Sequence, residues 1–173
     1  AQIVGYDGVD KRIDVLATAI HAGLKATQLK DLDLAYAPPY SSAKDPVNMA
    51  GFMIDNIANG TMKQWHLQDA YQLPRDGSVT LLDTRTVGEY SSGHIEGFAN
   101  IPVDELRERI GEIEAGKPVY VICQSGLRSY IATRILEGYG FEAYNFAGGF
   151  RFYDAVMNDR ALIETAYACG MDQ

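Results

Sequence analysis

Hydrophobic residues at helical spacing predict two amphipathic helices in the first third of the chain. The first is expected to begin after an N-cap at Asp10 and to end at Gly23, and its apolar face consists of Ile13, Leu16, Ala17 and Ile20. The second begins at Asp45-Pro46, because an acidic N-cap followed by proline favours a helix start, and Asn59-Gly60 ends it.

Three shorter segments accompany these helices. Residues 1–6 are predicted to form a strand, and a short helical stretch is expected around Leu29 and Leu32. Residues 35–42 contain two consecutive prolines, and because proline lacks a backbone donor they cannot form a helix interior.

From Thr61 onward the pattern alternates between strands and helices. Strands are predicted over 79–83, 119–122 and 141–146, and helices over 102–113, 127–136, 150–157 and 160–169. The apolar face of the helix at 127–136 is expected to consist of Leu127, Ile131 and Ile135. Such alternation indicates an α/β domain in which helices flank a parallel sheet. The sequence therefore predicts two domains, over residues 1–60 and 61–173.

Composition and charge narrow the classes of function. The net charge of −8 and the pI of about 4.8 argue against binding to nucleic acid or to a membrane surface. No apolar run approaches the length of a membrane span, and the first residues lack the pattern of a signal peptide. Cys123 and Cys169 are too few for a disulfide scaffold and lack metal-ligand spacing, so no metal site is expected. These features favour a cytoplasmic protein with free thiols.

Cys123 carries the strongest chemical signal, because it stands where a buried strand ends and a helix begins. In a parallel sheet, ligands bind beyond the carboxyl ends of the strands. The backbone N–H groups of the short loop can form a nest for negative charge, which Gly126 permits sterically and to which Arg128 and Ser129 add donors. The loop therefore favours a reactive thiolate that needs neither a metal nor a general base.

The loop Cys123-Gln124-Ser125-Gly126-Leu127-Arg128-Ser129 resembles the active loop of single-domain rhodaneses. Residues 82–97, closed by residues 100–102, resemble the first signature of that family, and residues 148–150 resemble its second. Phe98 departs from the pattern, since a small residue is usual there. The resemblance implies a rhodanese-like fold and a sulfurtransferase with Cys123 as nucleophile. The sulfur-binding loop would comprise Gln124, Ser125, Gly126, Leu127, Arg128 and Ser129.

Charged residues after the strand at 79–83 are better explained as a scaffold than as reactants. Asp83, Arg85 and Glu89 are expected to contribute to a buried arginine–carboxylate network, and His94 to cap a loop, so that together they support the cysteine loop. The two glycines at 148–149 are expected to close one wall of the site. Arg151 could face either the pocket or solvent.

The main rival enzyme class is a cysteine phosphatase or arsenate reductase on the same fold. Those enzymes cradle a tetrahedral oxyanion with five residues between the cysteine and the arginine, whereas four separate Cys123 from Arg128. The smaller ring favours sulfur over phosphate. A cysteine at a strand end can also be merely a small buried residue, but that would not explain Gly126, Arg128 and Ser129.

Residues 4–13, 33–41 and 45–48 resemble the dimerisation domain of pyridine nucleotide–disulfide oxidoreductases. The likeness is to coenzyme A–disulfide reductases, NADH oxidases and persulfide reductase flavoproteins, some of which end in a rhodanese domain. It implies that this chain is the C-terminal portion of such an enzyme, whose other part would bind FAD and NAD(P)H. Either Tyr36 or Tyr40 would approach the active site of a partner subunit; the alternative is that both only pack against the proline-rich turn.

These inferences lead to one leading and one alternative function. The leading hypothesis is transfer of sulfane sulfur through a persulfide on Cys123, with thiosulfate, polysulfide, coenzyme A persulfide or another thiol compound as the small anionic donor or acceptor. The alternative is a non-catalytic binding or regulatory module that mainly mediates dimerisation. Residues before Gly60 are expected to form a homodimer, and Cys169 is expected to be a bystander.

Overall fold

The computed structural model describes the backbone of residues 1–35, 37–39 and 43–168, and side chains as far as Ala161. The chain divides into two compact units, Ala1–Thr61 (unit 1) and Met62–Gln173 (unit 2). Tyr36, Tyr40 and Cys169 lie outside the described residues. None of the helices in the described part of the chain is long and apolar enough to cross a membrane.

Unit 1 consists of the helices α1 (Val9–His21) and α2 (Pro46–Ala58) and a 3-10 helix, η1 (Ala26–Asp31). Its small core is formed by Ala19, Leu29 and Val47. Gly51 lets α2 approach η1 closely, because a Cβ there would lie 2.2 Å from the backbone nitrogen of Lys30. The predicted cap at Asp45 is confirmed, since its carboxylate accepts a hydrogen bond from the Val47 amide.

Two predictions for unit 1 are wrong. Residues 1–5 form no strand in the structure, because an extended segment becomes a strand only where a neighbour completes its hydrogen bonds. Helix α1 is capped by Gly8 in a left-handed conformation rather than by Asp10, which lies in its first turn.

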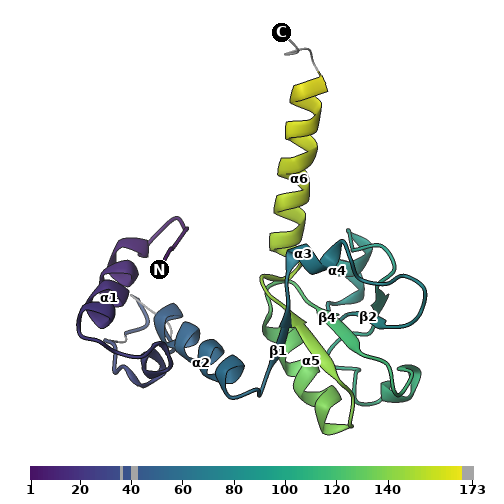
Figure 1. Ribbon diagram of the computed structural model, residues 1–173, viewed down its shortest axis with the longest axis horizontal. Coiled ribbons are helices and arrows are strands. Elements are labelled where there is room, and N and C mark those ends of the chain that lie inside the picture. The colour runs from purple at the N-terminus through teal and green to yellow at the C-terminus, as the bar shows by residue number, and fades with distance from the viewer. Residues whose placement is uncertain (36, 40–42, 169–173) are drawn as a thin grey trace. The chain divides into compact units, whose positions relative to one another are not determined.

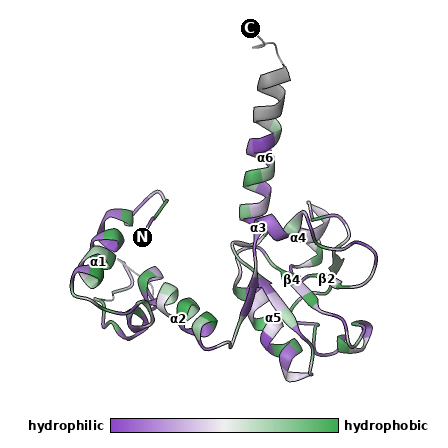
Figure 2. Cartoon of the chain, viewed as in Figure 1, coloured by the Kyte–Doolittle hydropathy of each residue, from purple (hydrophilic) through white to green (hydrophobic). Residues whose placement is uncertain are grey.

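Helix α2 is largely hydrophobic (Figure 2), and Met49, Met53, Ile54 and Ile57 on it are exposed.

Unit 2 is built on a five-stranded sheet whose strands all pair in parallel (Figure 1). The strands are β1 (Lys63–Trp65), β2 (Thr80–Asp83), β3 (Ala99–Asn100), β4 (Val119–Ile122) and β5 (Ala143–Phe146), and their order is β1-β5-β4-β2-β3. The prediction that residues 119–122 form a central strand is confirmed. The β-branched side chains of this strand are completely buried, as expected for a parallel sheet covered on both faces.

Helices and turns cover the two faces of the sheet. The helical elements are α3 (Leu67–Ala70), α4 (Val87–Ser91), the 3-10 helix η2 (Ile110–Glu112), α5 (Leu127–Gly138) and α6 (Gly149–Ala168). One core cluster joins Leu82 and Val121 to Ala132 and Leu136 of α5. The opposite cluster centres on Trp65, which contacts Phe146 and stacks on Phe98 at 6.0 Å. Phe98 is therefore a core residue.

Three predictions for unit 2 need correction. Residues 102–113 form consecutive turns followed by η2 rather than one helix, because their bonds are mainly of the i→i+3 type, as between Leu106 and Val103. The helices predicted at 150–157 and 160–169 are one continuous helix, α6, since no proline or glycine interrupts it. The third correction concerns the buried face of α5.

Helix α5 turns a different face to the sheet from the one predicted. Leu127 and Ile131 are 58% and 42% exposed, and of the predicted face only Ile135 is buried. The buried face carries Ser129, Ala132, Thr133, Ile135 and Leu136. Polar contacts to the Cys123 loop hold the first turn of this helix and so fix which of its faces is buried. Leu127 and Ile131 therefore stay exposed, although burying them would be favourable.

Candidate active site

The sulfur atom of Cys123 lies at the carboxyl end of the central strand β4, directly before the loop that leads to α5. Two donors lie within hydrogen-bonding distance of it: the backbone nitrogen of Gly126, 3.1 Å from Sγ, and the hydroxyl of Ser129, 3.2 Å from Sγ. Cys123 is only 1% exposed, and Ser129 is fully buried. Donors at this range stabilise a thiolate, which is the reactive form of cysteine.

The curl of the loop depends on Gly126. Its φ of 111° lies in the left-handed region that side chains disfavour, and this conformation turns its N–H toward the sulfur. Gly126 is also the N-cap of α5, and its carbonyl accepts the first helical hydrogen bond, from the Tyr130 nitrogen at 3.0 Å. The sulfur therefore lies near the positive end of a 12-residue helix.

The turn at Gly148-Gly149 supports the cysteine loop from the other side. The Phe150 nitrogen donates to the Cys123 carbonyl at 2.7 Å, and the Arg151 nitrogen donates to the Gln124 carbonyl at 3.1 Å. A Cβ on Gly149 would lie 2.5 Å from both the Gln124 oxygen and the Ser125 nitrogen. The backbones touch here only because this residue is glycine.

Asp83 and Arg85 form an ion pair within the predicted arginine–carboxylate network, and both are almost completely buried. The Arg85 guanidinium donates to both carboxylate oxygens of Asp83 and to the Gly93 carbonyl, and it contacts the Gln124 side chain at 3.4 Å. Its Cζ lies 3.9 Å from the centre of the Phe150 ring. This cluster joins the end of β2 to the cysteine loop and to the start of α6.

A second ion pair lies at the opening of the loop, between Arg128 and Glu89. Two hydrogen bonds of 2.7 Å join the guanidinium to the two carboxylate oxygens. Arg128, followed by the Thr86 backbone and hydroxyl donors, lowers the pKa of Glu89 to about 2 against the opposing effect of burial. Arg128 is thus neutralised by Glu89, and among the described side chains Ser129 provides the hydrogen bond to the sulfur.

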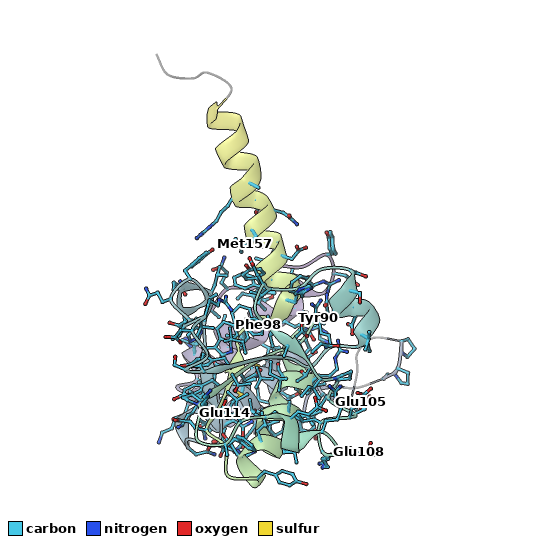
Figure 3. The ribbon with its side chains drawn as sticks, turned by 90° about the vertical axis from the view of Figure 1, so that its right-hand side faces the viewer. Tyr90, Phe98, Glu105, Glu108, Glu114 and Met157 are labelled. Carbon is cyan, nitrogen blue, oxygen red and sulfur yellow. The ribbon has the colours of Figure 1, made fainter. Side chains whose placement is uncertain are left out.

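His94 does not touch the cysteine loop. Its Nδ1 lies 3.1 Å from the Tyr90 carbonyl near the end of α4, and its exposed ring stacks on that of Tyr90 at 3.9 Å. The Tyr90 hydroxyl donates to the Phe98 carbonyl, and Figure 3 labels both residues near the base of α6. His94 therefore caps α4, and its link to the site passes through Gly93, which accepts from Arg85.

The outer residues of the loop border open space. Gln124 and Gly126 are half-buried, whereas Ser125 and Leu127 are exposed, and so is Arg151. A hollow of about 320 Å³ beside the loop is lined by Arg85, Glu89, Ser92, Gly93, Gln124 and Phe150. The loop thus offers a recess next to a buried sulfur.

Two asparagines at the site were missed by the sequence reasoning. Asn100 donates to the carbonyls of Asp83 and Arg85, so it supports the ion pair. Asn145 on β5 is 4% exposed and donates to the carbonyl of Gly126 at 3.3 Å. One sequence signal could have revealed Asn145: it is a polar residue two positions after the buried Ala143, so both side chains lie on the same face of the strand.

The chain belongs to the rhodanese-like domain family, which matches residues 66–155. It is 46% identical to the crystal structure of reduced Bacillus anthracis CoADR-RHD, with a TM-score of 0.84 over 89% of this chain and 28% of that one. It is 41% identical to a NAD-dependent persulfide reductase from A. fulgidus, with a TM-score of 0.73 over 86% of this chain and 26% of that one. A coenzyme A disulfide reductase of Staphylococcus aureus is 52% identical over 52 residues, which are 30% of this chain and 12% of the relative.

These likenesses cover more than the rhodanese-like region. Because unit 2 makes up less than two thirds of the chain, a match over 89% of it must include most of unit 1. The chain spans 57% or less of the length of the first curated relatives it matches. The family assignment therefore agrees with the resemblance found in the sequence, for the fold and for the class of relatives.

Proposed function

We propose that this chain transfers sulfane sulfur through a persulfide on Cys123. The observation that carries the proposal is the position of Sγ, which lies within 3.2 Å of two hydrogen-bond donors at the end of the central strand. Those donors stabilise negative charge on Sγ, both in the free thiolate and as charge develops on Sγ when an acceptor removes the outer sulfur of the persulfide. Arg85 and Arg128 each pair with a carboxylate, so they shape the loop rather than act as free cations.

The transfer consists of two displacements at sulfur. The Cys123 thiolate attacks the outer sulfur of a donor persulfide, a new S–S bond forms, and the S–S bond of the donor breaks to release the donor thiolate. An acceptor thiolate then attacks the outer sulfur on Cys123, takes it away and restores the cysteine thiolate. Each step exchanges one S–S bond for another, so no external oxidant or reductant is needed.

The hollow beside the loop suits the part of the donor that is not transferred. Phe150 and Gly93 supply apolar surface there, and Gln124 supplies an amide, while the Arg85 guanidinium and the Glu89 carboxylate line the hollow as members of ion pairs. A small anionic sulfur compound such as thiosulfate, a polysulfide or coenzyme A persulfide is the proposed substrate class. The fold does not specify which of these compounds is the donor, so the donor is identified by an assay in which they compete for Cys123.

We further propose that the transfer unit works within a flavin-dependent coenzyme A–disulfide or persulfide reductase. The likeness to CoADR-RHD and to a persulfide reductase, which extends into unit 1, supports this context. FAD and NAD(P)H would bind to another part of that enzyme, since no G-x-G-x-x-G fingerprint occurs in the printed sequence. The flavin part would supply the electrons that reduce the persulfide leaving Cys123.

The experiment is an intact-mass measurement of the chain after incubation with polysulfide or thiosulfate. We expect a gain of one sulfur atom on the wild type and on Cys169→Ser, and no gain on Cys123→Ser. The Cys169→Ser control separates the proposed carrier from the other cysteine of the chain. An unchanged wild-type mass with every donor would refute sulfur transfer and support the alternative, a non-catalytic binding module.

A further inference from the structure

Three donors surround the carbonyl oxygen of Gly126 in the cysteine loop. The Tyr130 nitrogen lies 3.0 Å from it, the Ser129 hydroxyl 3.1 Å, and the amide nitrogen of Asn145 3.3 Å. The same Ser129 hydroxyl lies 3.2 Å from the sulfur of Cys123. A serine hydroxyl has a single proton, so it can donate either to the carbonyl or to the sulfur, but not fully to both.

Asn145 reaches this carbonyl from the neighbouring strand. Its orientation is set by chemistry, because only the NH2 end of the amide can donate to an oxygen, and this end also lies 3.5 Å from the Met62 sulfur. Its Oδ1 is buried and has no hydrogen-bond partner among the described residues. A buried, half-satisfied amide destabilises a fold, so it is expected where it serves another purpose.

We propose that Asn145 is a positioning residue that keeps the Ser129 proton directed at the Cys123 sulfur. A carbonyl oxygen has two lone pairs, and the Tyr130 nitrogen and the Asn145 amide fill both. With both positions filled, the Ser129 hydroxyl gains most by donating to the thiolate. Without Asn145, one lone pair becomes free, the hydroxyl turns to the carbonyl, and the thiolate loses one of its two donors.

This inference rests on the proposed function only in one respect: sulfur transfer explains why a stable thiolate on Cys123 is useful. The charged groups around the sulfur lie on other elements: Arg128 of α5 pairs with Glu89 of α4, and Arg85 pairs with Asp83 at the end of β2. Asn145 is neutral, and its described hydrogen bonds, to Met62 and Gly126, involve none of these four residues. A change in thiolate stability on replacing it would therefore come from hydrogen bonding rather than from a lost charge.

The test is a pH titration of the thiolate by its ultraviolet absorbance. It uses the full chain in a Cys169→Ser background, with Cys123→Ser as the blank that removes the tyrosine signal. Asn145→Leu has a similar volume but no donor, and we expect it to raise the titration midpoint by about one pH unit. A shift of that size is about a tenfold change in the thiol–thiolate equilibrium constant, close to the effect of one charge-assisted hydrogen bond.

The decisive comparison is a double-mutant cycle with Ser129→Ala. Because Asn145 acts through the Ser129 hydroxyl, we expect Asn145→Leu to add no further shift once that hydroxyl is gone. An equal shift in both backgrounds would overturn the inference, since Asn145 would then act independently of Ser129. A wild-type profile for Asn145→Leu would overturn it as well.

Folding is checked by thermal melting followed through Trp65, which lies in the core of unit 2. If Asn145→Leu fails to fold, Asn145→Ala replaces it, because its short side chain removes the amide donor and adds no steric overlap. The mass experiment on Cys123 is a separate readout. A wild type that takes no sulfur but shows the Asn145–Ser129 coupling would defeat the proposed function and leave this inference standing, and the reverse result would do the opposite.

Discussion

Replacing Gly149 with alanine should damage the active loop without removing any of its side chains. Gly149 has a φ of 69°, and a Cβ there would meet the Gln124 oxygen and the Ser125 nitrogen at 2.5 Å. Both obstacles are backbone atoms, so no side-chain rotation can relieve the overlap. Ordinary contact begins near 3.4 Å, so the turn and the loop must separate by about 1 Å.

Two contributions to the loss of stability in Gly149→Ala can be separated. The left-handed backbone costs alanine about 1–2 kcal/mol, and the overlap adds roughly 1–3 kcal/mol of overpacking. Gly77 is a matched control in the same unit, because its φ of 82° is similar and nothing lies within 4 Å of the added Cβ. Gly77→Ala should therefore show only the backbone cost.

The assay follows both stability and chemistry. Denaturant unfolding monitored by the fluorescence of Trp65, the one tryptophan of the chain, reports on unit 2. The rate at which Cys123 gains sulfur from polysulfide should fall about 100-fold in Gly149→Ala, as expected for a misplacement near 1 Å, and stay near wild type in Gly77→Ala. Equal behaviour of the two variants in both measurements would refute the close contact between turn and loop.

Three further outcomes are expected. Arg85→Ala leaves the Asp83 carboxylate buried and unpaired, so the free energy of unfolding measured through Trp65 should fall by about 3–5 kcal/mol. The pKa of Glu89 is lowered to about 2, so its ion pair with Arg128 stabilises the fold above about pH 4.5 and is lost as the pH falls toward 2. The difference in free energy of unfolding between wild type and Glu89→Gln should therefore shrink over that pH range. It should start from at most about 1 kcal/mol, because the pair is one-third exposed. We also propose that α2 mediates a two-fold dimer, and light scattering should show wild type as a dimer and the double variant Met53→Lys, Ile57→Lys as a monomer; equal masses would contradict this interface.

Local chemistry made the cysteine loop predictable from the sequence. A buried strand, a glycine with an unusual backbone and a helix start leave few ways to arrange seven consecutive residues, and the buried pairing of Asp83 with Arg85 follows from their position at a strand end. The predicted domain boundary lies at 60/61, and the compact units of the structure meet between Thr61 and Met62. Signals of this kind need no knowledge of distant residues.

Features that depend on distant partners could not be predicted. The short strands β1 and β3 exist only because β5 and β2 pair with them, and two or three residues carry no periodicity of their own. The face that α5 buries follows from the docking of its first turn rather than from its aliphatic residues. The sequence presents Arg128 and Ser129 alike as donors to the loop, because nothing in it shows that Glu89 already pairs with Arg128.

The strand order also determines when this site can form during protein synthesis. Strand β1 stands at the sheet edge beside β5, and the ion pair between Lys63 and Glu142 spans 79 residues of chain. A ribosome releases the chain from its N-terminus, so β1 must wait without its partner until β5 emerges. Asn145 and Gly149, which support the cysteine loop, emerge at that same late stage. A nascent chain that ends after α5 would therefore carry Cys123 without the contacts that bury and hold it.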